Sequence, residues 1–581
     1  MTSIMRALPF LLAATVLTSC ATSPPEDDVT AYGAFLAARY AGVNRDAQGA
    51  ADYYVEALDR LPGNAVLTDR AFITSVIAGD LDRASRLAVE SSTSGDPSRL
   101  ATLYHASDLI AGRQYARAID TLQGGPDYGP YNTFFASVLR QWALMGAGRT
   151  DEAIADAGEM QAPGFLSAHL WLHKAMLFDV AGEPEAAEAS YRSAVFSSTF
   201  RRLATEMYGG FLVRQGRRAD AVALYDAYLG DDPGEASILA ARDLAAGHGR
   251  APRRPGIPGL AARSVLGPTA DLSAQADMDL TVIYMRMIQR LDPDLAPLHV
   301  ALAGTLDRIG LHDLALAEYA RVPQGPFRLG ADIDRIVLMA TLGRMSAAYD
   351  AARALAETSG EPEAILLYAD LARIHGDCAT AVGLYSQAIG INRERGLPED
   401  WRYHYFQASC EVENDNWPAA EAAYHEALVV APNQPTVLND LGYLWLERGE
   451  HIDEAFEMVT QAARTDPDNG SFIDSLGWAY YLLGHYELAV QELERAAELS
   501  PGSPTVNLHL GDAYWQVGRH LEAGFQWQRA ADLNPTPQQA EAIAQRLANG
   551  RPPVEEPVIA EAETETGAGV GADADSEAGE P

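Results

Sequence analysis

The chain has 581 residues, with 43 lysine and arginine residues against 80 aspartate and glutamate residues, which gives a net charge of −37. A surface this acidic repels nucleic acid and anionic lipid headgroups, so neither is expected as a direct ligand. The single lysine, Lys174, does not follow a glycine-rich stretch, which excludes a phosphate-binding loop of the Walker type. The sequence also lacks GxSxG, HExxH, CxxC and dinucleotide-binding motifs. We therefore expect no catalytic residues, no cofactor and no metal, and a binding protein rather than an enzyme.

The first twenty residues have the pattern of an export signal. One basic side chain, Arg6, precedes an apolar run at 7–16 that is too short to span a membrane. Leu17-Thr18-Ser19-Cys20 follows at once and resembles the lipobox of bacterial lipoproteins, in which diacylglycerol is attached to the cysteine. The attachment needs Cys20 because the reacting group is a sulfur nucleophile. The alternative is an ordinary cleaved signal that contains a cysteine by chance.

The lipoprotein resemblance implies a signal peptide at 1–19 and a lipidated tether at 20–30. Several acyl chains hold a protein on a membrane far more firmly than one chain does. Ala21, rather than aspartate, follows the cysteine. By resemblance to lipoprotein sorting, this implies the periplasmic face of the outer membrane, with the lipid as the contact to the membrane.

Residues 31–246 carry a weak repeat of small and aromatic side chains. The first unit has Ala38, Ala50, Tyr54, Ala57 and Pro62. Alanines at helical spacing let helices approach closely while larger residues fill the remaining space, so we predict pairs of helices. The units at 64–95, 98–125 and 131–160 keep mainly a turn glycine and one alanine, and stacking between stronger units would stabilise them.

Two histidines of this region, His169 and His173, are four residues apart on one predicted helix. That spacing would let them share a metal ion. No third ligand is evident in the sequence, so we do not predict a metal site.

Residues 247–268 interrupt the repeats. The stretch GHGRAPRRPGIPG at 247–259 is rich in glycine and proline and holds the one tight basic cluster, Arg250, Arg253 and Arg254. Gly267-Pro268 should also break the next helix. We interpret 247–268 as a linker between two repeat segments, and a partner-docking loop is the alternative.

Residues 269–549 contain the strongest repeats. Pro432, Pro467, Pro501 and Pro535 are 35, 34 and 34 residues apart. Between them one pattern occurs twice, as Leu476, Gly477, Tyr480, Gly484, Tyr486, Ala489, Leu493 and Ala496, and again as Leu510, Gly511, Tyr514, Gly518, Ala523, Trp527 and Ala530. These residues resemble the tetratricopeptide repeat. The resemblance implies an all-α superhelical solenoid of about a dozen helix pairs.

In tetratricopeptide repeats the first helix of each pair lines a groove. By that resemblance, the strong repeats place in the groove aromatic, amide and carboxylate side chains, namely Tyr405, Asn439, Tyr443, Asp474, Trp478, Tyr481, Asp512 and Trp515. Aromatic rings offer a large contact area, and asparagine can bond to an extended peptide backbone. Packing between repeats is the alternative role for each residue. The clamp of Lys, Arg and Asn with which some family members hold a C-terminal carboxylate is missing here, so an acidic peptide tail is not expected in this groove.

Apart from Cys20, the chain has two cysteines, Cys378 and Cys410. They fall on predicted helices that neighbour each other in a stacked solenoid. In an oxidising periplasm they could form a disulfide, and two buried free cysteines are the alternative.

The segments LNDLGYLWLERGEHIDEAF, DPDNGSFIDSLGWAYYLLGHYELAV and HLGDAYWQVGRHLEA carry a more particular resemblance. They are similar to the C-terminal repeats of large outer-membrane tetratricopeptide lipoproteins that partner a carboxyl-terminal processing protease. In that family the lipoprotein is an adaptor for the protease and its periplasmic substrates. The resemblance implies such protein partners. The alternative is an assembly factor for a secretion, pilus or outer-membrane machine, and an envelope enzyme is a third hypothesis.

The end of the chain differs in composition from the repeats. Residues 551–581 hold nine acidic residues amid alanine, glycine and proline, and almost nothing that would form a core. We therefore predict a disordered acidic tail at 550–581.

Overall fold

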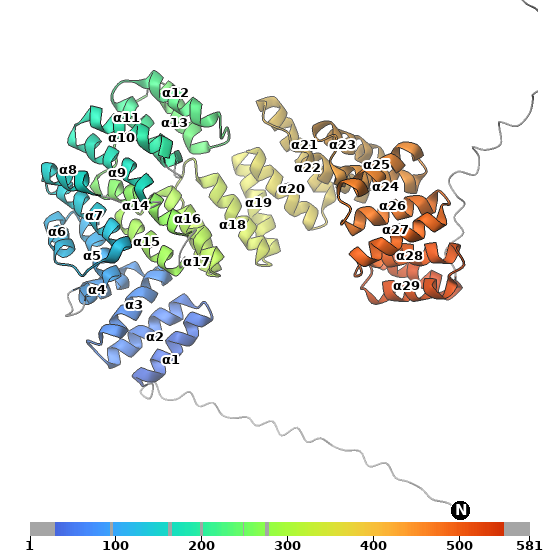
Figure 1. Ribbon diagram of the computed structural model, residues 1–581, viewed down its shortest axis with the longest axis horizontal. Helices are drawn as coiled ribbons and strands as arrows, with labels where there is room; N and C mark the ends of the chain where they lie inside the picture. The colour runs from blue at the N-terminus through green and yellow to red at the C-terminus, as the bar shows by residue number, and fades with distance from the viewer. Residues whose placement is uncertain are drawn as a thin grey trace, which may run out of the picture. The chain divides into compact units, whose positions relative to one another are not determined.

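The computed structural model describes residues 30–550, apart from 93–96, 161–165, 198–200, 248 and 274–277. This part of the chain contains thirty α-helices and no strand. It forms two compact units, which we call unit 1, ending at Ala347, and unit 2, beginning at Ala348 (Figure 1). The predicted signal peptide, Cys20 with nearly all of the tether, and the predicted acidic tail from 551 onward lie outside the described residues. The prediction of an all-α repeat fold is confirmed.

Most consecutive helices of unit 1 pack against each other (Figure 1). Its helices are α1 (Ala31–Val43), α2 (Ala47–Arg60), α3 (Ala65–Ala78), α4 (Leu81–Ser92), α5 (Arg99–Ala111), α6 (Tyr115–Gln123), α7 (Gly129–Gly146), α8 (Thr150–Glu159), α9 (Leu166–Ala181), α10 (Pro184–Ser197), α11 (Arg201–Arg214), α12 (Arg218–Leu229), α13 (Ala236–Ala246), α14 (Ile257–Ser273), α15 (Met278–Leu291), α16 (Ala296–Arg308), α17 (His312–Ala320) and α18 (Arg328–Thr341).

Unit 2 repeats the same arrangement with greater regularity. Helix α19 (Met345–Ser359) crosses the division between the units. The others are α20 (Pro362–Ile374), α21 (Cys378–Arg395), α22 (Trp401–Glu413), α23 (Trp417–Val430), α24 (Pro435–Arg448), α25 (Ile452–Thr465), α26 (Gly470–Leu482), α27 (Tyr486–Leu499), α28 (Pro504–Gln516), α29 (His520–Asp532) and α30 (Pro537–Asn549).

The small residues of the strong repeats let the two helices of a pair touch. A Cβ atom placed on Gly477 would lie 2.6 Å from Cγ of Leu493, and one on Gly511 would lie 2.5 Å from Cδ1 of Trp527. Ala489 and Ala523, on the second helices, have no exposed surface. Replacing either glycine would therefore push the paired helices apart.

Turn residues set the ends of the helices as the sequence predicts. Gly484 and Gly518 join the first helix of a pair to the second, with φ angles of 75° and 79° that favour glycine. Pro467 and Pro501 lie in the turns α25–α26 and α27–α28. A proline at these positions cannot extend the preceding helix, so each repeat stops at the same point.

The predicted linker differs from the structure in its second part. Residues 257–268 are helical, and α14 runs through Pro268 to Ser273. Leu260, Ala261 and Leu266 of this helix are buried, and Thr269 donates a hydrogen bond from its hydroxyl to the carbonyl of Val265 at 2.7 Å. Burial on several sides thus outweighs the hydrogen bond that a proline removes from the helix.

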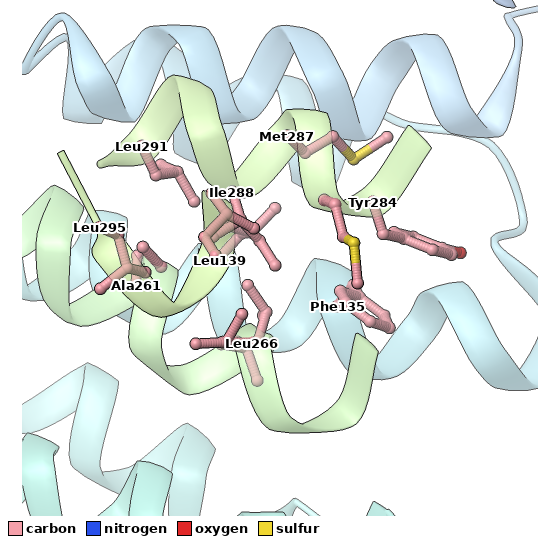
Figure 2. Packing of buried hydrophobic residues seen from close by; sticks show 14 of the residues in the cluster. Phe135, Leu139, Ala261, Leu266, Tyr284, Met287, Ile288, Leu291 and Leu295 are labelled. Atoms are coloured by element: carbon pink, nitrogen blue, oxygen red, sulfur yellow. The ribbon is translucent and has the colours of Figure 1, made fainter. Parts of the chain in front are cut away.

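Helices α14 and α15 lie against the first helices of the preceding pairs. Helix α14 packs on α7 and α9, and α15 packs on α3 and α5. Figure 2 shows Leu139 of α7 among side chains of α14 and α15. Phe135 of α7 stacks on Tyr284 of α15, with ring centroids 4.4 Å apart. The hairpin α14–α15 thereby covers the side of unit 1 that α3, α5, α7 and α9 share, which we call the inner face.

None of the helices in the described ranges combines the length and the apolar composition that crossing a bilayer requires.

Cys378 and Cys410 lie next to each other in unit 2. They join α21 to α22 as a disulfide, with Cα atoms 4.9 Å apart and a sequence separation of 32. Both side chains are buried. The bridge therefore ties one repeat to the next inside the stack.

Alkylation of unfolded, unreduced protein is expected to leave Cys378 and Cys410 unmodified, whereas reduction first should expose both to the reagent. Replacing both with alanine should lower the free energy of unfolding of unit 2 by about 2–4 kcal/mol, because the closed loop restricts the unfolded chain. Mass spectrometry measures the labelling. Urea unfolding followed by tryptophan fluorescence measures the stability, since six of the eight tryptophans lie in unit 2. Full labelling without reduction would contradict the disulfide.

Candidate functional site

The eight predicted groove residues all lie on first helices of unit 2, but most of them are not open to a ligand. Five of them are buried, namely Asn439, Asp474, Trp478, Tyr481 and Asp512. Three are partly exposed, namely Tyr405, Tyr443 and Trp515. Each of these three comes from a different repeat, on α22, α24 and α28. Of the eight predicted groove residues, the structure therefore leaves three partly open, all of them aromatic.

Trp478 shows why the other residues are covered. Its ring lies between Tyr481 and His509, with centroid distances of 4.5 Å and 4.0 Å. Its indole N–H donates a hydrogen bond to Glu447 of the preceding first helix. Only 5% of the side-chain surface stays exposed. Trp478 thus packs between repeats, and the groove role expected for it is not what this structure shows.

Polar contacts repeat at the spacing of one repeat along these first helices. The hydroxyl of Tyr405 donates to Asp440 at 2.7 Å, and Nδ1 of His509 lies 3.1 Å from Asp474. Each pair is separated by 35 residues. We call these two contacts, together with the contact between Asp512 and Arg546, the inter-repeat ladder. Because each contact joins one first helix to the next, the ladder fixes the register of the stack.

Asp512 is the most enclosed carboxylate of the ladder. Arg546 of α30 donates to it from Nη2 and Nε, at 2.6 Å and 2.7 Å, and Trp527 donates its indole N–H at 2.9 Å. A buried carboxylate needs such charged and hydrogen-bonded partners to offset the loss of water. Asp512 is therefore committed to holding the last helix in place.

The buried charges shift the pKa values of their neighbours. Burial by itself would lower the pKa of His509, but the charge and hydrogen bond of Asp474 raise it above the ordinary value. Burial raises the pKa of Asp440, against hydrogen bonds from Asn439 and Tyr405 that lower it. The ladder thus contains a paired histidine and a carboxyl group whose ionisation the interior opposes.

In unit 1 the inner face is occupied by the chain itself. Trp142 of α7 donates its indole N–H to the hydroxyl of Ser264 at 2.9 Å, and Arg290 of α15 donates to Asp108 of α5 at 2.6 Å. These bonds add to the apolar packing of α14 and α15. Sequence reasoning missed this docking. A signal for it was present, since the sequence after residue 247 loses the repeat pattern and then gives a segment at 278–291 that is rich in large apolar side chains.

The two histidines considered for a metal site bind α14 instead. Nε2 of His169 lies 2.8 Å from Asp271, and Nδ1 of His173 lies 3.1 Å from the hydroxyl of Ser264. Nε2 of His173 also lies 2.6 Å from Gln141. No group of three metal-binding side chains occurs in the part of the chain that the structure describes. Both rings therefore position the hairpin.

A second buried charge cluster, which the sequence did not reveal, lies beside the hairpin. Arg286 of α15 and Glu318 of α17 form an ion pair with almost no exposure, and Nδ1 of His299 lies 2.9 Å from Glu318. Burial would raise the pKa of Glu318, but the bonds from His299 and Arg286 lower it to about 2. A Cβ on Gly79, whose φ is +82°, would lie 2.8 Å from Nη2 of Arg286. The cluster thus ties α15 to α17 and to the end of α3.

Trp478→Ala is expected to lower the free energy of unfolding of unit 2 by about 3–5 kcal/mol, because it leaves a cavity between two repeats. The matched control is Phe525→Ala on α29, whose ring is 65% exposed and whose loss should change the stability by no more than about 0.5 kcal/mol. Urea unfolding followed by circular dichroism compares the two. An unchanged unfolding midpoint for Trp478→Ala would contradict the packing role and would favour a role for Trp478 in the groove.

The stability of unit 1 should fall on acidification through His173. Burial, with a smaller effect of the Lys174 charge, lowers the pKa of His173 to about 3. Below pH 6.5 His173 is therefore protonated in the unfolded chain but stays neutral in the folded one. Between pH 7 and pH 5 this difference lowers the free energy of unfolding by about 2 kcal/mol. The variant His173→Gln should lack that part of the pH dependence. Hydrogen exchange of α9 at both pH values measures it, and equal losses in the two proteins would refute the assignment.

Comparisons with known proteins identify the repeats. A model described as "Tetratricopeptide repeat" matches residues 172–236, 366–435 and 411–470, and one described as "TPR repeat" matches 477–518. The TPR repeat-containing protein PA4667 of Pseudomonas aeruginosa is 27% identical over 173 residues, which are 29% of this chain and 28% of that protein. The BBSome complex member BBS4 of Bos taurus is 26% identical over 118 residues, 20% of this chain and 21% of that protein. The matches thus span less than a third of either curated relative.

Solved structures that match the chain include yeast Tom70, with 16% identity and a TM-score of 0.32, over 90% of this chain and 95% of that one. A tetratricopeptide repeat protein from Parabacteroides merdae has 15% identity and a TM-score of 0.36, over 43% of this chain and 97% of that one. The segments that match the family models coincide with helix pairs in both units, α9–α12 in unit 1 and α20–α28 in unit 2. These matches identify residues 172–236, 366–470 and 477–518 of the chain as tetratricopeptide repeats.

Proposed function

We propose that this protein is a lipid-anchored periplasmic scaffold that brings other proteins together. In its more specific form, the proposal is an adaptor that recruits a carboxyl-terminal processing protease and its substrates. The observation that carries the scaffold role is the series of helix pairs in unit 2, most of which match the repeat models between residues 366 and 518 and whose first helices are held in line by the inter-repeat ladder. Repeats of this kind offer an extended surface for binding proteins.

The inter-repeat ladder also lowers the entropy that would be lost when a partner protein binds. Tyr405 and Trp515 remain partly exposed while their positions are fixed, Tyr405 by Asp440 and Trp515 by stacking on His520 at 3.9 Å. An aromatic side chain that is already held in place loses little entropy when a partner binds. The partly exposed first-helix aromatics are therefore suited to anchor a partner protein.

The location rests on two separate features. Leu17-Thr18-Ser19-Cys20 has the form of a lipidation site, and the disulfide between Cys378 and Cys410 suits an oxidising compartment. The net charge of −37 would keep the chain away from anionic headgroups, so a covalent lipid is the means of holding it at a membrane. We propose no chemistry for the protein itself. Its effect would be to raise the local concentration of a protease near its substrates.

The variant Cys20→Ser is expected to move from the membrane fraction to the soluble periplasm and to lose labelling by radioactive palmitate, because its hydroxyl cannot replace the thiolate. Ser19→Ala, which keeps a small residue before the cysteine, should stay labelled and bound to the membrane. A Cys20→Ser protein that remains lipidated would contradict the anchor.

Crosslinking in intact cells, followed by purification and mass spectrometry of wild type and Cys20→Ser, then identifies the partners. A processing protease as the dominant partner would support the adaptor. Envelope assembly components without a protease would favour the assembly factor instead. A chain that crosslinks to no other protein would argue against any scaffold role.

A further inference from the structure

Unit 1 contains an open cavity at its first repeat. Its volume is about 400 Å³, and it lies between α1, α2 and α3 at the point where α15 begins. The walls are apolar at Val43, Tyr54, Ile73 and Ile77. Three arginines also line the cavity, namely Arg39, Arg45 and Arg70, together with the single acidic residue Asp279. We call it the Arg39–Arg70 cavity.

The cavity is the part of the inner face that the hairpin α14–α15 leaves open. Helix α15 covers the end of α3, where Gly79 lies against Arg286. Arg70 and Ile73, earlier on the same helix, line the cavity instead. Asp279, the second residue of α15, forms its edge. Helices α5, α7 and α9 pack against the hairpin, whereas the part of α3 around Arg70 and Ile73 lines the cavity.

Two of the arginines have no partner. Arg39 and Arg70 are exposed, and neither guanidinium forms a hydrogen bond or an ion pair with any other residue in the described ranges. Arg45 makes only a loose ion pair with Asp279, at 3.7 Å and with both side chains about half exposed. Such a group of free guanidinium ions in a chain of net charge −37 is a local site for an anion. An arginine can hold a carboxylate with two parallel hydrogen bonds.

Apolar surface continues from the cavity onto α1. Val43, a cavity residue, is 80% exposed, and Leu36 and Tyr40 on the adjoining face are also exposed. Residues spaced by three or four positions share one side of a helix, so these side chains form a strip beside the arginines. A small anion such as phosphate would use the arginines but not the strip. The combination suits a peptide with both acidic and apolar side chains.

We propose that the Arg39–Arg70 cavity binds an extended segment of a partner protein in which an apolar side chain is flanked by aspartate or glutamate. The apolar side chain would enter between Ile73 and Ile77, and the flanking carboxylates would pair with Arg39 and Arg70. This inference rests on the proposed scaffold function and adds the chemistry of one of its partners. It also differs from the groove expected in unit 2, where no arginine clamp was predicted.

The test is a selection of random 12-residue peptides displayed on phage, with the full-length protein as bait. Three baits are compared, namely wild type, the double variant Arg39→Gln/Arg70→Gln, and the control Arg86→Gln/Arg464→Gln. Arg86 and Arg464 are also exposed and also without a partner among the described residues, but they lie on α4 and α25, away from the cavity. Circular dichroism verifies that all three proteins are folded, which is expected because every changed side chain is exposed.

Wild type and control should enrich peptides with Asp or Glu next to Ile, Leu, Val or Phe, and the double variant should not. A selected peptide, made synthetically, should bind the double variant at least tenfold more weakly, and its affinity for wild type should fall as salt increases. Ile73→Ser should weaken binding while keeping the preference for acidic residues. No acidic–apolar enrichment on wild type, or the same enrichment on the double variant, would overturn the proposal. If the cavity proposal failed in this way but partner proteins still crosslinked to the double variant in cells, the proposed scaffold function would still hold.

Discussion

Each described helix pair of this protein has an apolar face that must be buried against another element. The structure depends on which element buries it. In unit 2 each pair is covered by the next repeat, and the close approach at Gly477 and Gly511 packs the two helices of a pair tightly against each other. In unit 1 the repeats also bury their inner face against α14 and α15. The same requirement thus gives an open series of repeats in one unit and a filled inner face in the other.

Buried charge is used in both units to fix helices that apolar packing alone would leave free to slide. Arg546 holds Asp512 on the last repeat, and Arg286 holds Glu318 beside the hairpin. Burying such an ion pair costs desolvation free energy, and removing one partner strongly destabilises the fold. The pair therefore fixes the positions of the two helices more than it adds net stability. The arginine-rich, lysine-poor composition suits this use, because a guanidinium can bond to a carboxylate through two nitrogens.

This arrangement limits where partner proteins can bind. Some side chains at groove positions, such as Trp478 and Asp512, are buried by contacts between repeats and are not open to a partner. Accessible surfaces include three partly exposed aromatic side chains in unit 2, namely Tyr405, Tyr443 and Trp515, and the Arg39–Arg70 cavity in unit 1. Two surfaces of different chemistry on one chain are suited to two different partners, as the proposed adaptor role would require.

The sequence by itself determined the repeat fold, because glycine, alanine and proline act locally: Gly484 permits a left-handed turn, Ala489 permits a close helix, and Pro501 ends one. Their spacing therefore predicted the helix pairs and turns of unit 2. Only the tertiary structure decided which first-helix residues are open and that α14, with Pro268 inside it, docks on the inner face. Burial at Trp478 and pairing at Arg286 depend on neighbours that are 31 and 32 residues away in the chain. Local periodicity does not encode those contacts, since the same residue types suit a groove, a core or an ion pair equally well.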